Sequence, residues 1–284
     1  MHDPEQVPPF SVRLRTRALW GLMRTVSYPR LEELHRSGRL ALFERVVHGG
    51  DLIVLGGLSP RLRLSGAHFT LWGAQAFTVL VGCHEPMVQE ALRRTLAPGM
   101  TFVDVGANIG ATSLLAATFV GPTGRVVAVD AQAECVAALE ANAARNGFAQ
   151  MTALHAAVGR ETGTADVVVV ADALWTRLLS VGGHPLEVRR DVVRATTLDA
   201  LIASGEIPVP DVVKVDVEGA ELDVLAGMEC VLADARPVLI CEMHGKNAAF
   251  CAAMDAAGYR VVDLDGPGSV ATGGPNTHAF CEPR

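Results

Sequence analysis

The stretch TFVDVGANIGATS, residues 101–113, decides the fold of this chain. Its apolar first half predicts a buried strand that runs into Asp104, and its last residues predict the start of a helix. Gly106 permits a tight turn between the two elements, and such a turn directs backbone N–H groups and a helix N-terminus at a ligand. The carboxylate of Asp104, at the end of the strand, can accept from a ligand ammonium group or fix the loop.

The spacing of this glycine turn leaves three interpretations of its ligand open. A dinucleotide site has the pattern GxGxxG, whose second glycine leaves room for a pyrophosphate. Here Asn108 stands at that position, and the next glycine, Gly110, comes one residue early. A ligand without a phosphate at this point, such as S-adenosylmethionine, avoids the crowding, and we favour it over a dinucleotide and over a plain structural turn. Asp130 ends the next apolar strand and fits a ribose-binding carboxylate, a helix cap, or both.

Outward from this turn, short apolar strands alternate with helical segments, among them a strand over 151–159 and a helix over 220–232. This alternation predicts a parallel sheet with helices on both faces. An irregular loop, residues 265–276, joins the last two strands as in a hairpin. We therefore predict an α/β fold with a Rossmann-like, doubly wound, seven-stranded, mostly parallel sheet that has an antiparallel edge strand. An N-terminal extension of helices and short strands precedes it.

One boundary divides the chain into two parts. Residues 1–84 form the extension, with helices over 11–27 and 29–47 followed by short strands, and residues 85–284 form the main domain. Within the main domain, residues 160–196 interrupt the strand–helix rhythm with strand-like segments. We predict that this insertion covers the carboxyl edge of the sheet, where ligands bind in such folds.

Composition narrows the class of protein. Half of the 284 residues are apolar, which is enough for a sizeable core, yet no apolar run reaches the roughly 18 residues of a membrane helix. The N-terminus does not have the pattern of a secretory signal, and the six cysteines show no CxxC spacing, so we expect a cytoplasmic protein with reduced thiols. The net charge of −7 combines +4 in residues 1–100 with −11 in residues 101–284, and this acidic balance argues against nucleic-acid binding by residues 101–284. We expect the arginine-rich N-terminal helices to pack on the main domain as a hairpin, with a membrane-surface contact or a homodimer contact as the alternatives.

The chain resembles a known family in segments spread between Glu85 and Phe280. They are DVGANIG (104–110), GPTGRVVAVD (121–130), NAARNG (142–147), TLDAL (197–201), VVKVDVEGAELDVLAG (212–227) and LICEMHG (239–245). The combination of DVGANIG with KVDVEGAE is similar to the FkbM family of class I S-adenosylmethionine-dependent methyltransferases. The resemblance implies methyl transfer, usually to oxygen, on small molecules or sugars in secondary metabolism and glycan tailoring.

The resemblance also implies which residues hold the methyl donor. The glycine turn would line the methionine end, Asp130 the ribose, the segment after the third strand the adenine, and Asp216 the sulfonium. The full set of donor-site residues is Glu85, Asp104, Gly106, Ala107, Asn108, Gly110, Asp130, Ala131, Ala156, Ala157 and Asp216.

Charged side chains cluster at the ends of two further predicted strands. Because strand side chains alternate, Lys214, Asp216 and Glu218 share one side of the first strand, and Glu242 and His244 share one side of the second. Buried charges are costly unless they are paired, so we expect these groups to face the crevice above the sheet.

Three chemical interpretations fit this cluster. His244 is a candidate general base for an attacking hydroxyl, oriented by Glu242 or Asp216. Alternatively, Asp216, Glu218, Glu242 and His244 include ligands of a divalent metal such as Mg²⁺, or the group is an ion-pair network with Lys214. We favour the base over the metal and name His244, Asp216, Glu242 and Glu218 as the catalytic candidates.

Two residues of the insertion are candidates for acceptor contacts. These are Trp175 and Arg177, since an arginine suits an acidic group. The sequence therefore predicts an S-adenosylmethionine-dependent O-methyltransferase that acts on a small-molecule acceptor. A dinucleotide-dependent oxidoreductase and a non-catalytic, donor-binding assembly partner stay as alternatives.

Overall fold

The computed structural model describes residues 51–54, 58, 62–65, 78–79, 82, 84–170, 176–182 and 187–284. The chain divides into two compact units, Met1–Pro86 and Met87–Arg284, and each is described by itself. In the first unit, β1 (Asp51–Ile53) pairs antiparallel with β2 (Arg63–Ser65). The helices predicted over 11–27 and 29–47 lie outside the described residues.

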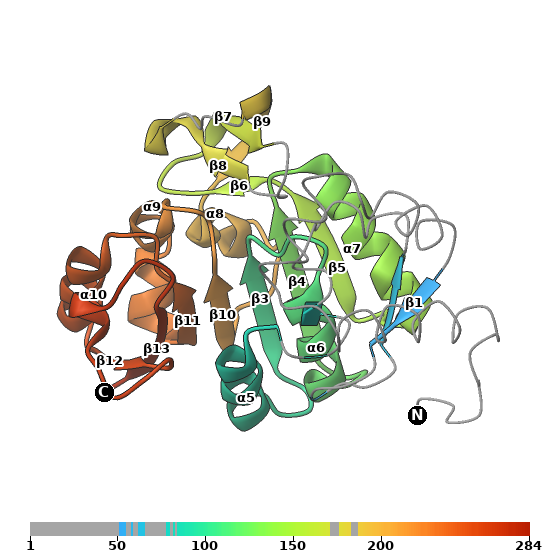
Figure 1. Ribbon diagram of the computed structural model, residues 1–284, viewed down its shortest axis with the longest axis horizontal. Helices are drawn as coiled ribbons and strands as arrows, with labels where there is room; N and C mark the ends of the chain where they lie inside the picture. The colour runs from blue at the N-terminus through green and yellow to red at the C-terminus, as the bar shows by residue number, and fades with distance from the viewer. Residues whose placement is uncertain are drawn as a thin grey trace, which may run out of the picture. The chain divides into compact units, whose positions relative to one another are not determined.

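A seven-stranded sheet forms the centre of the second unit (Figure 1), and it confirms the predicted fold class. Its strand order is β12-β13-β11-β10-β3-β4-β5. The parallel neighbours are β3 (Thr101–Val105), β4 (Arg125–Asp130), β5 (Met151–His155), β10 (Val212–Val215) and β11 (Val238–Glu242). The chain moves outward from β3 in one direction and from β10 in the other. The crevice between the carboxyl ends of β3 and β10 is therefore the expected ligand position in such a sheet.

Helices cover both faces of this sheet because its central strands are apolar on both sides. On one face, Leu139 packs against Ala128 of β4. On the other face, Leu201, Val224 and Phe250 share a core with the strands. The helices are α5 (Pro86–Thr95), α6 (Ala111–Val120), α7 (Ala133–Asn146), α8 (Leu198–Ala203), α9 (Glu221–Ala226) and α10 (Asn247–Ala256). Within the described residues, every helix is too short or too polar to span a bilayer.

The antiparallel strand of the sheet, β13 (His278–Pro283), lies between β11 and the outermost strand, β12 (Tyr259–Asp263). The hairpin predicted at this side of the sheet is thus present, with its antiparallel strand one position in from the edge. Because β13 runs against its neighbours, its first residue lies where the parallel strands end. His278 consequently pairs in register with Glu242, the last residue of β11.

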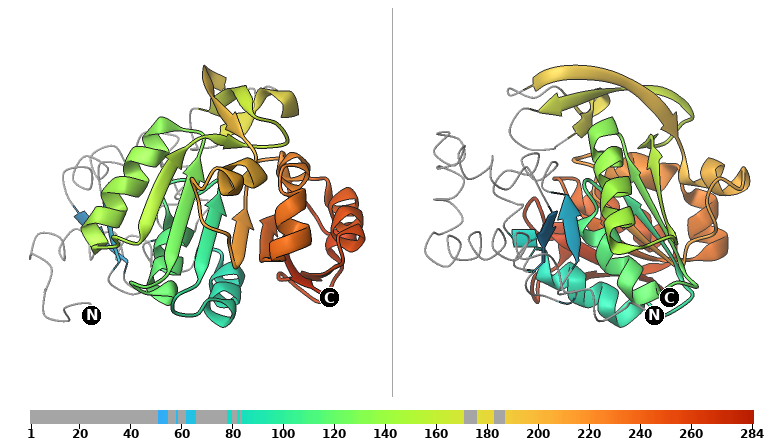
Figure 2. Two further views of the ribbon diagram at one scale, coloured as in Figure 1. Left: turned by 180° about the vertical axis from the view of Figure 1, so that it is seen from behind. Right: turned by 90° about the vertical axis from the view of Figure 1, so that its right-hand side faces the viewer.

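The insertion forms a second sheet, which lies beyond the carboxyl ends of the central strands (Figures 1 and 2). Its strands are β6 (Ala157–Val158), β7 (Gly163–Val170), β8 (Thr176–Leu178) and β9 (Glu187–Thr196), in the order β6-β9-β7-β8. The single strand predicted over 151–159 divides at Ala156. The residues before it pair with β4, whereas those after it pair with β9.

The helix predicted over 220–232 is broken into two pieces. The first piece, α9, ends at Ala226, and a π-helical turn follows at Val231–Ala235. Gly227 lies between them, against the chain that follows β6. A Cβ atom at Gly227 would lie 1.9 Å from the carbonyl oxygen of Gly159. The helix stops here because the two backbones touch, a contact that helical periodicity does not reveal.

We expect Gly227→Ala to destabilise the fold by about 2 kcal/mol or more, because neither backbone can yield without shifting the insertion. Gly266→Ala is the matched control, since a Cβ there meets nothing within 4 Å. It should change the free energy of unfolding by less than about 1 kcal/mol. Urea unfolding followed by circular dichroism measures both, and equal effects of the two substitutions would contradict the packing argument.

Candidate active site

The glycine turn after β3 is shaped by the backbone that follows β10. Gly106 has φ 81, and a Cβ atom there would lie 1.8 Å from the carbonyl oxygen of Asp216. The N–H of Asp216 donates to the carbonyl of Val105 at 2.9 Å. The first glycine therefore makes room for the protein's own chain rather than for a phosphate, and it fixes Asp216 beside the turn.

Asp130 is held at the same place by two backbone donors. The N–H of Asn108 donates to Oδ2 and the N–H of Gln132 to Oδ1, each at 2.8 Å. Burial raises the pKa of this carboxyl to about 6, because the loss of water, together with the repulsion from Asp104 and Asp216, outweighs the two hydrogen bonds that lower it. Each carboxylate oxygen keeps a lone pair that can accept from a ligand hydroxyl.

Asp104 has a structural partner. The hydroxyl of Ser113, in the first turn of α6, donates to its Oδ2 at 2.5 Å. Of the two roles predicted for this buried carboxylate, the structure shows the one that fixes the loop, because the bond ties β3 to α6. Its cross-strand neighbour in register is Lys214 of β10.

The residues predicted for the adenine lie next to Asp130. The N–H of Ala156 donates to the carbonyl of Asp130 at 3.0 Å. Ala131 packs in one apolar cluster with Ala157 and Val193, which belong to the insertion sheet and the strand leading into it. An apolar surface beside the carboxylate predicted to hold a ribose suits a planar base.

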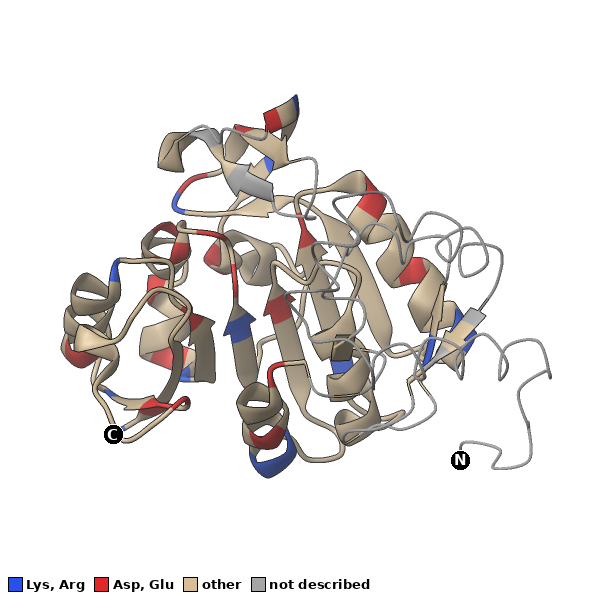
Figure 3. Ribbon diagram, viewed as in Figure 1, with Lys and Arg blue, Asp and Glu red and all other residues tan. Residues whose placement is uncertain are grey.

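Acidic residues gather where β3 and β4 end and in the chain after β10 (Figure 3), namely Asp104, Asp130, Asp216 and Glu218. The ammonium group of Lys214, which is buried, lies 3.0 Å from Oδ2 of Asp216. Unlike charges stabilise one another strongly in a site that excludes water.

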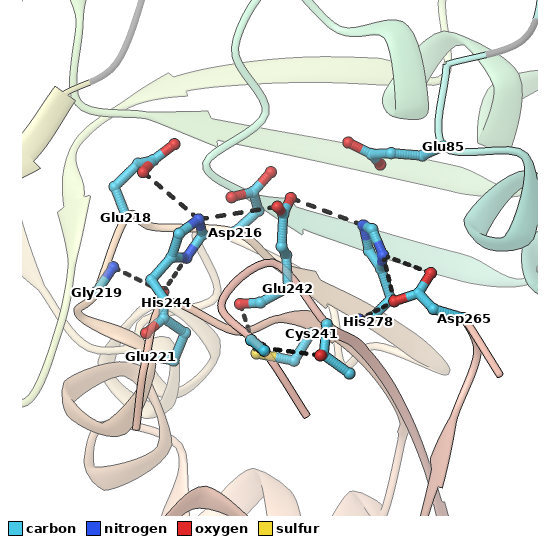
Figure 4. Close-up of polar contacts among 12 residues, drawn as sticks. Glu85, Asp216, Glu218, Gly219, Glu221, Cys241, Glu242, His244, Asp265 and His278 are labelled. Atoms are coloured by element: carbon cyan, nitrogen blue, oxygen red, sulfur yellow. Dashed lines mark hydrogen bonds and ion pairs between the residues drawn. The ribbon is translucent and has the colours of Figure 1, made fainter. Parts of the chain in front are cut away.

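The four catalytic candidates are brought together around His244 (Figure 4). Its Nε2 lies 3.4 Å from Glu218 and 3.9 Å from Glu242. Asp216 offers a carboxylate oxygen within 4.8 Å of the ligand atoms of Glu218 and His244. Nε2 is thus the ring atom that faces the carboxylates at the carboxyl edge.

The residue that orients His244 is Glu221, and this corrects the prediction of Glu242 or Asp216. Oε1 of Glu221 lies 2.9 Å from Nδ1 of His244 and accepts from the N–H of Gly219 at 2.8 Å. Glu221 is fully buried at the start of α9. The only sequence signal was a second glutamate in VEGAE, three residues after Glu218.

These carboxylates keep the proton on His244. Burial by itself lowers the pKa of the imidazolium, but the hydrogen bond to Glu221 and the charges of the surrounding carboxylates outweigh it. Together they raise the pKa from 6.5 to about 9. The ring is therefore charged at neutral pH in the ligand-free protein.

Two residues that the sequence analysis missed extend the cluster. Nε2 of His278 lies 3.7 Å from Oε2 of Glu242, and its Nδ1 lies 3.1 Å from Asp265 (Figure 4). Glu242 thus stands between two histidines, each held at Nδ1 by another carboxylate. Only the pairing of β13 with β11 brings His278 here, so no local motif could have indicated it.

The metal interpretation meets an obstacle in this geometry. Asp216, Glu218 and His244 are close enough to share one cation. However, Lys214 already pairs with Asp216, and its ammonium group would repel a divalent ion. Among the described residues, the arrangement favours an ion-pair network over a metal centre.

Three further predicted residues lie in the first unit or have no described side chain. Glu85 belongs to the first unit, where its carboxylate lies 3.1 Å from Nε2 of His84. Trp175 lies outside the described residues. Arg177 is in β8, opposite Val168 in register, and its side chain is not among those described.

The comparison with protein families shows to which family the chain belongs. The model of the methyltransferase FkbM domain matches residues 104–261, which is more than half of the sequence. This chain belongs to the FkbM methyltransferase domain family. The FkbM match begins at Asp104 and ends in β12, so it contains the glycine turn, Asp130 and the cluster around His244.

Individual relatives of this FkbM domain are distant. Hexuronic acid methyltransferase AglP of Haloferax volcanii is 30% identical over 142 residues, which cover 50% of this chain and 54% of AglP. The chain thus spans about half the length of this curated relative. Among solved structures, methyltransferase FkbM from Methylobacillus flagellatus is 14% identical, with 92% of this chain and 64% of that chain covered and a TM-score of 0.45. A methyltransferase from Geobacter sulfurreducens is 14% identical, with 71% and 78% covered and a TM-score of 0.42.

The raised pKa of His244 predicts a pH-dependent contribution to stability. A basic group whose pKa rises on folding stabilises fully below its unfolded value, near 6.5, and loses that effect as the pH passes about 9. The free energy of unfolding of the wild type should therefore exceed that of His244→Gln most at pH 6. By pH 10 this difference should shrink by about 2–3 kcal/mol. Urea unfolding at intervals of pH measures it, and a difference that stays constant across this range would contradict the assignment.

Proposed function

We propose that this FkbM chain transfers a methyl group from S-adenosylmethionine to an oxygen atom of a sugar or another small molecule. The observation that carries the proposal is the acidic surrounding of the glycine turn. Asp104, Asp130 and Asp216 lie near enough that the first and last raise the pKa of the carboxyl between them. Such a site repels the pyrophosphate of a dinucleotide and attracts a cationic donor.

The residues present fit this donor. The Asp130 carboxylate has acceptor capacity for the ribose hydroxyls, and the apolar cluster of Ala131 and Ala157 suits the adenine. When bound, the donor supplies an electrophilic methyl group on a positively charged sulfur atom. Asp216, beside the turn, suits that positive charge.

His244 supports the oxygen chemistry. An acceptor hydroxyl must lose its proton as it attacks, and Nε2 of His244 is the ring atom placed to receive it. Glu221 holds the other ring nitrogen and stabilises the charged ring that results. The positively charged sulfur of the bound donor would lie beside Asp216, close to the charged ring of His244. Because a neighbouring positive charge lowers the pKa of an imidazolium, His244 would release its resting proton more easily once the donor is bound.

The class of acceptor follows from the relative and from the position of the insertion. AglP is, by name, a methyltransferase of hexuronic acid. We propose a sugar oxygen for this chain also, held under the insertion sheet beyond the carboxyl ends of the strands. Residues 85–284 would then form the catalytic domain.

Calorimetry with the full chain tests the donor. We expect S-adenosylmethionine and S-adenosylhomocysteine to bind, and NAD to give no heat. Asp130→Asn should weaken both adenosyl ligands by about tenfold, since a charged acceptor of ribose hydroxyls is lost. Saturation by NAD without any response to the adenosyl ligands would overturn the proposal.

The same Asp130 carboxyl predicts a pH dependence of binding. Ribose hydroxyls donate to the ionised form, so S-adenosylhomocysteine should bind more weakly as the pH falls through about 6, the pKa of this buried group. Titrations between pH 5 and 8 measure the effect. Asp130→Asn is the control and should flatten it; the same slope in the variant would assign the effect to another group.

His244→Ala separates chemistry from donor binding. The substitution should leave the affinity for S-adenosylhomocysteine unchanged and reduce turnover by about 10²–10⁴-fold, the range of general acid–base catalysis. Transfer of a labelled methyl group to a panel of free and glycosidic sugars, hexuronic acids included, measures turnover. An equally active variant would remove His244 from the reaction.

A further inference from the structure

Lys246 contacts the turn that carries Glu218, although the proposed reaction gives it no role. It stands directly before α10, and its ammonium group donates to the carbonyl of Gly219 at 3.0 Å. Gly219 lies between the end of β10 and the start of α9, so this bond joins two loops at the carboxyl edge of the sheet. The other lysine of the chain, Lys214, bonds to Asp216. Both lysines therefore bind the segment that follows β10.

The backbone of this turn needs support. Glu218 has φ 53 and Gly219 has φ 103, so both residues are in the left-handed region. A residue with a Cβ atom seldom adopts that conformation unless its surroundings impose it. The N–H of Gly219 donates to Oε1 of Glu221 at 2.8 Å, while Lys246 binds the carbonyl of the same residue. Gly219 is thus held at both its donor and its acceptor, and the conformation of Glu218 is fixed with it.

The turn directs the Glu218 carboxylate at the proposed base. Oε2 of Glu218 lies 3.4 Å from Nε2 of His244 (Figure 4). Glu221, which holds the other ring nitrogen, is fully buried at the start of α9, so the helix sets its position. Glu218 has 26% of its side chain exposed and lies in the turn itself. Its distance from His244 therefore depends on the conformation at Gly219.

His244 and Lys246 reach this turn from one short segment. Gly245, between them, has φ 94, a conformation that reverses the chain and is easiest for glycine. We propose that Lys246 is a positioning residue, which holds the turn at Gly219 and thereby keeps the Glu218 carboxylate against His244. So placed, Glu218 stabilises the charged ring that forms when His244 accepts a proton. This inference rests on the proposed function for the role of His244 as the base.

The direction of one pKa change tests the proposal. Removal of a nearby cation by itself raises the pKa of an imidazolium, whereas movement of a carboxylate away from the ring lowers it. In the ligand-free full chain, Lys246→Met should lower the pKa of His244 from about 9 to about 8. NMR titration of the histidine side chains measures this pKa, and the signal that is missing from His244→Gln identifies the ring.

Three further variants sharpen the measurement. Lys246→Arg keeps a donor for the carbonyl and should keep the pKa of His244 near 9. Arg125→Met is the matched control, because Arg125 also donates to a glycine carbonyl, that of Gly124 at 2.9 Å, but at the start of β4 and so at the opposite edge of the sheet. It should leave the pKa unchanged. Glu218→Gln should itself lower the pKa, and Lys246→Met should add no further fall in that background.

An unchanged or raised pKa of His244 in Lys246→Met would overturn the inference, since Lys246 would then act as a surface charge alone. A fall of equal size in the Glu218→Gln background would also overturn it, because Lys246 would then act through another group. Equal falls in Lys246→Arg or in Arg125→Met would contradict the role of the hydrogen bond to Gly219. Failure of the proposed function is a separate result, in which the wild-type chain does not bind S-adenosylhomocysteine, whereas this titration needs no ligand.

Discussion

The contact between the glycine turn and the backbone of Asp216 is the constraint on which the site depends. It joins the ends of β3 and β10, the two strands at which the sheet reverses its order. With no side chain at Gly106, the two loops meet directly, and Asp216 is fixed beside Asp104 and Asp130. The side-chain amide of Asn142, in α7, donates to the carbonyl of Ile109 at 3.0 Å and secures the far end of the turn.

The charges in this crevice explain why a lysine is buried there, and they contribute to two raised pKa values. Lys214 is one of two lysines in the chain, and it is buried on a central strand. Its ammonium group offsets part of the repulsion among the carboxylates around it. The ion pair with Asp216 holds this positive charge at the carboxyl end of β10. The raised pKa values of Asp130 and His244 share one contribution, the negative charge of neighbouring carboxylates, which adds to the effect of burial at Asp130 and outweighs it at His244.

The remaining parts of the site come from elements distant in the chain. The helix that starts at Glu221 supplies the carboxylate that holds His244, and the reversed strand β13 supplies His278 beside Glu242. Asp265, in the loop between the last strands, is the most open member of this series, with 42% of its side chain exposed. The proposed reaction edge is therefore assembled from both halves of the sheet, whereas the proposed nucleoside side comes from β4 and the insertion sheet.

Local sequence determined the alternation of strands and helices, the glycine turn and the positions of Asp104, Asp130 and Asp216, because periodicity and strand-end carboxylates are properties of a few consecutive residues. It also indicated the cluster of Asp216, Glu218, Glu242 and His244, since strand side chains alternate and parallel strands end at one edge. Only the tertiary structure decided that Glu221 orients His244, that α9 stops at Gly227, and that His278 and Asp265 join the cluster. Those features depend on contacts between backbones and strands far apart in the chain, and no pattern within one segment records which distant segment will pack against it.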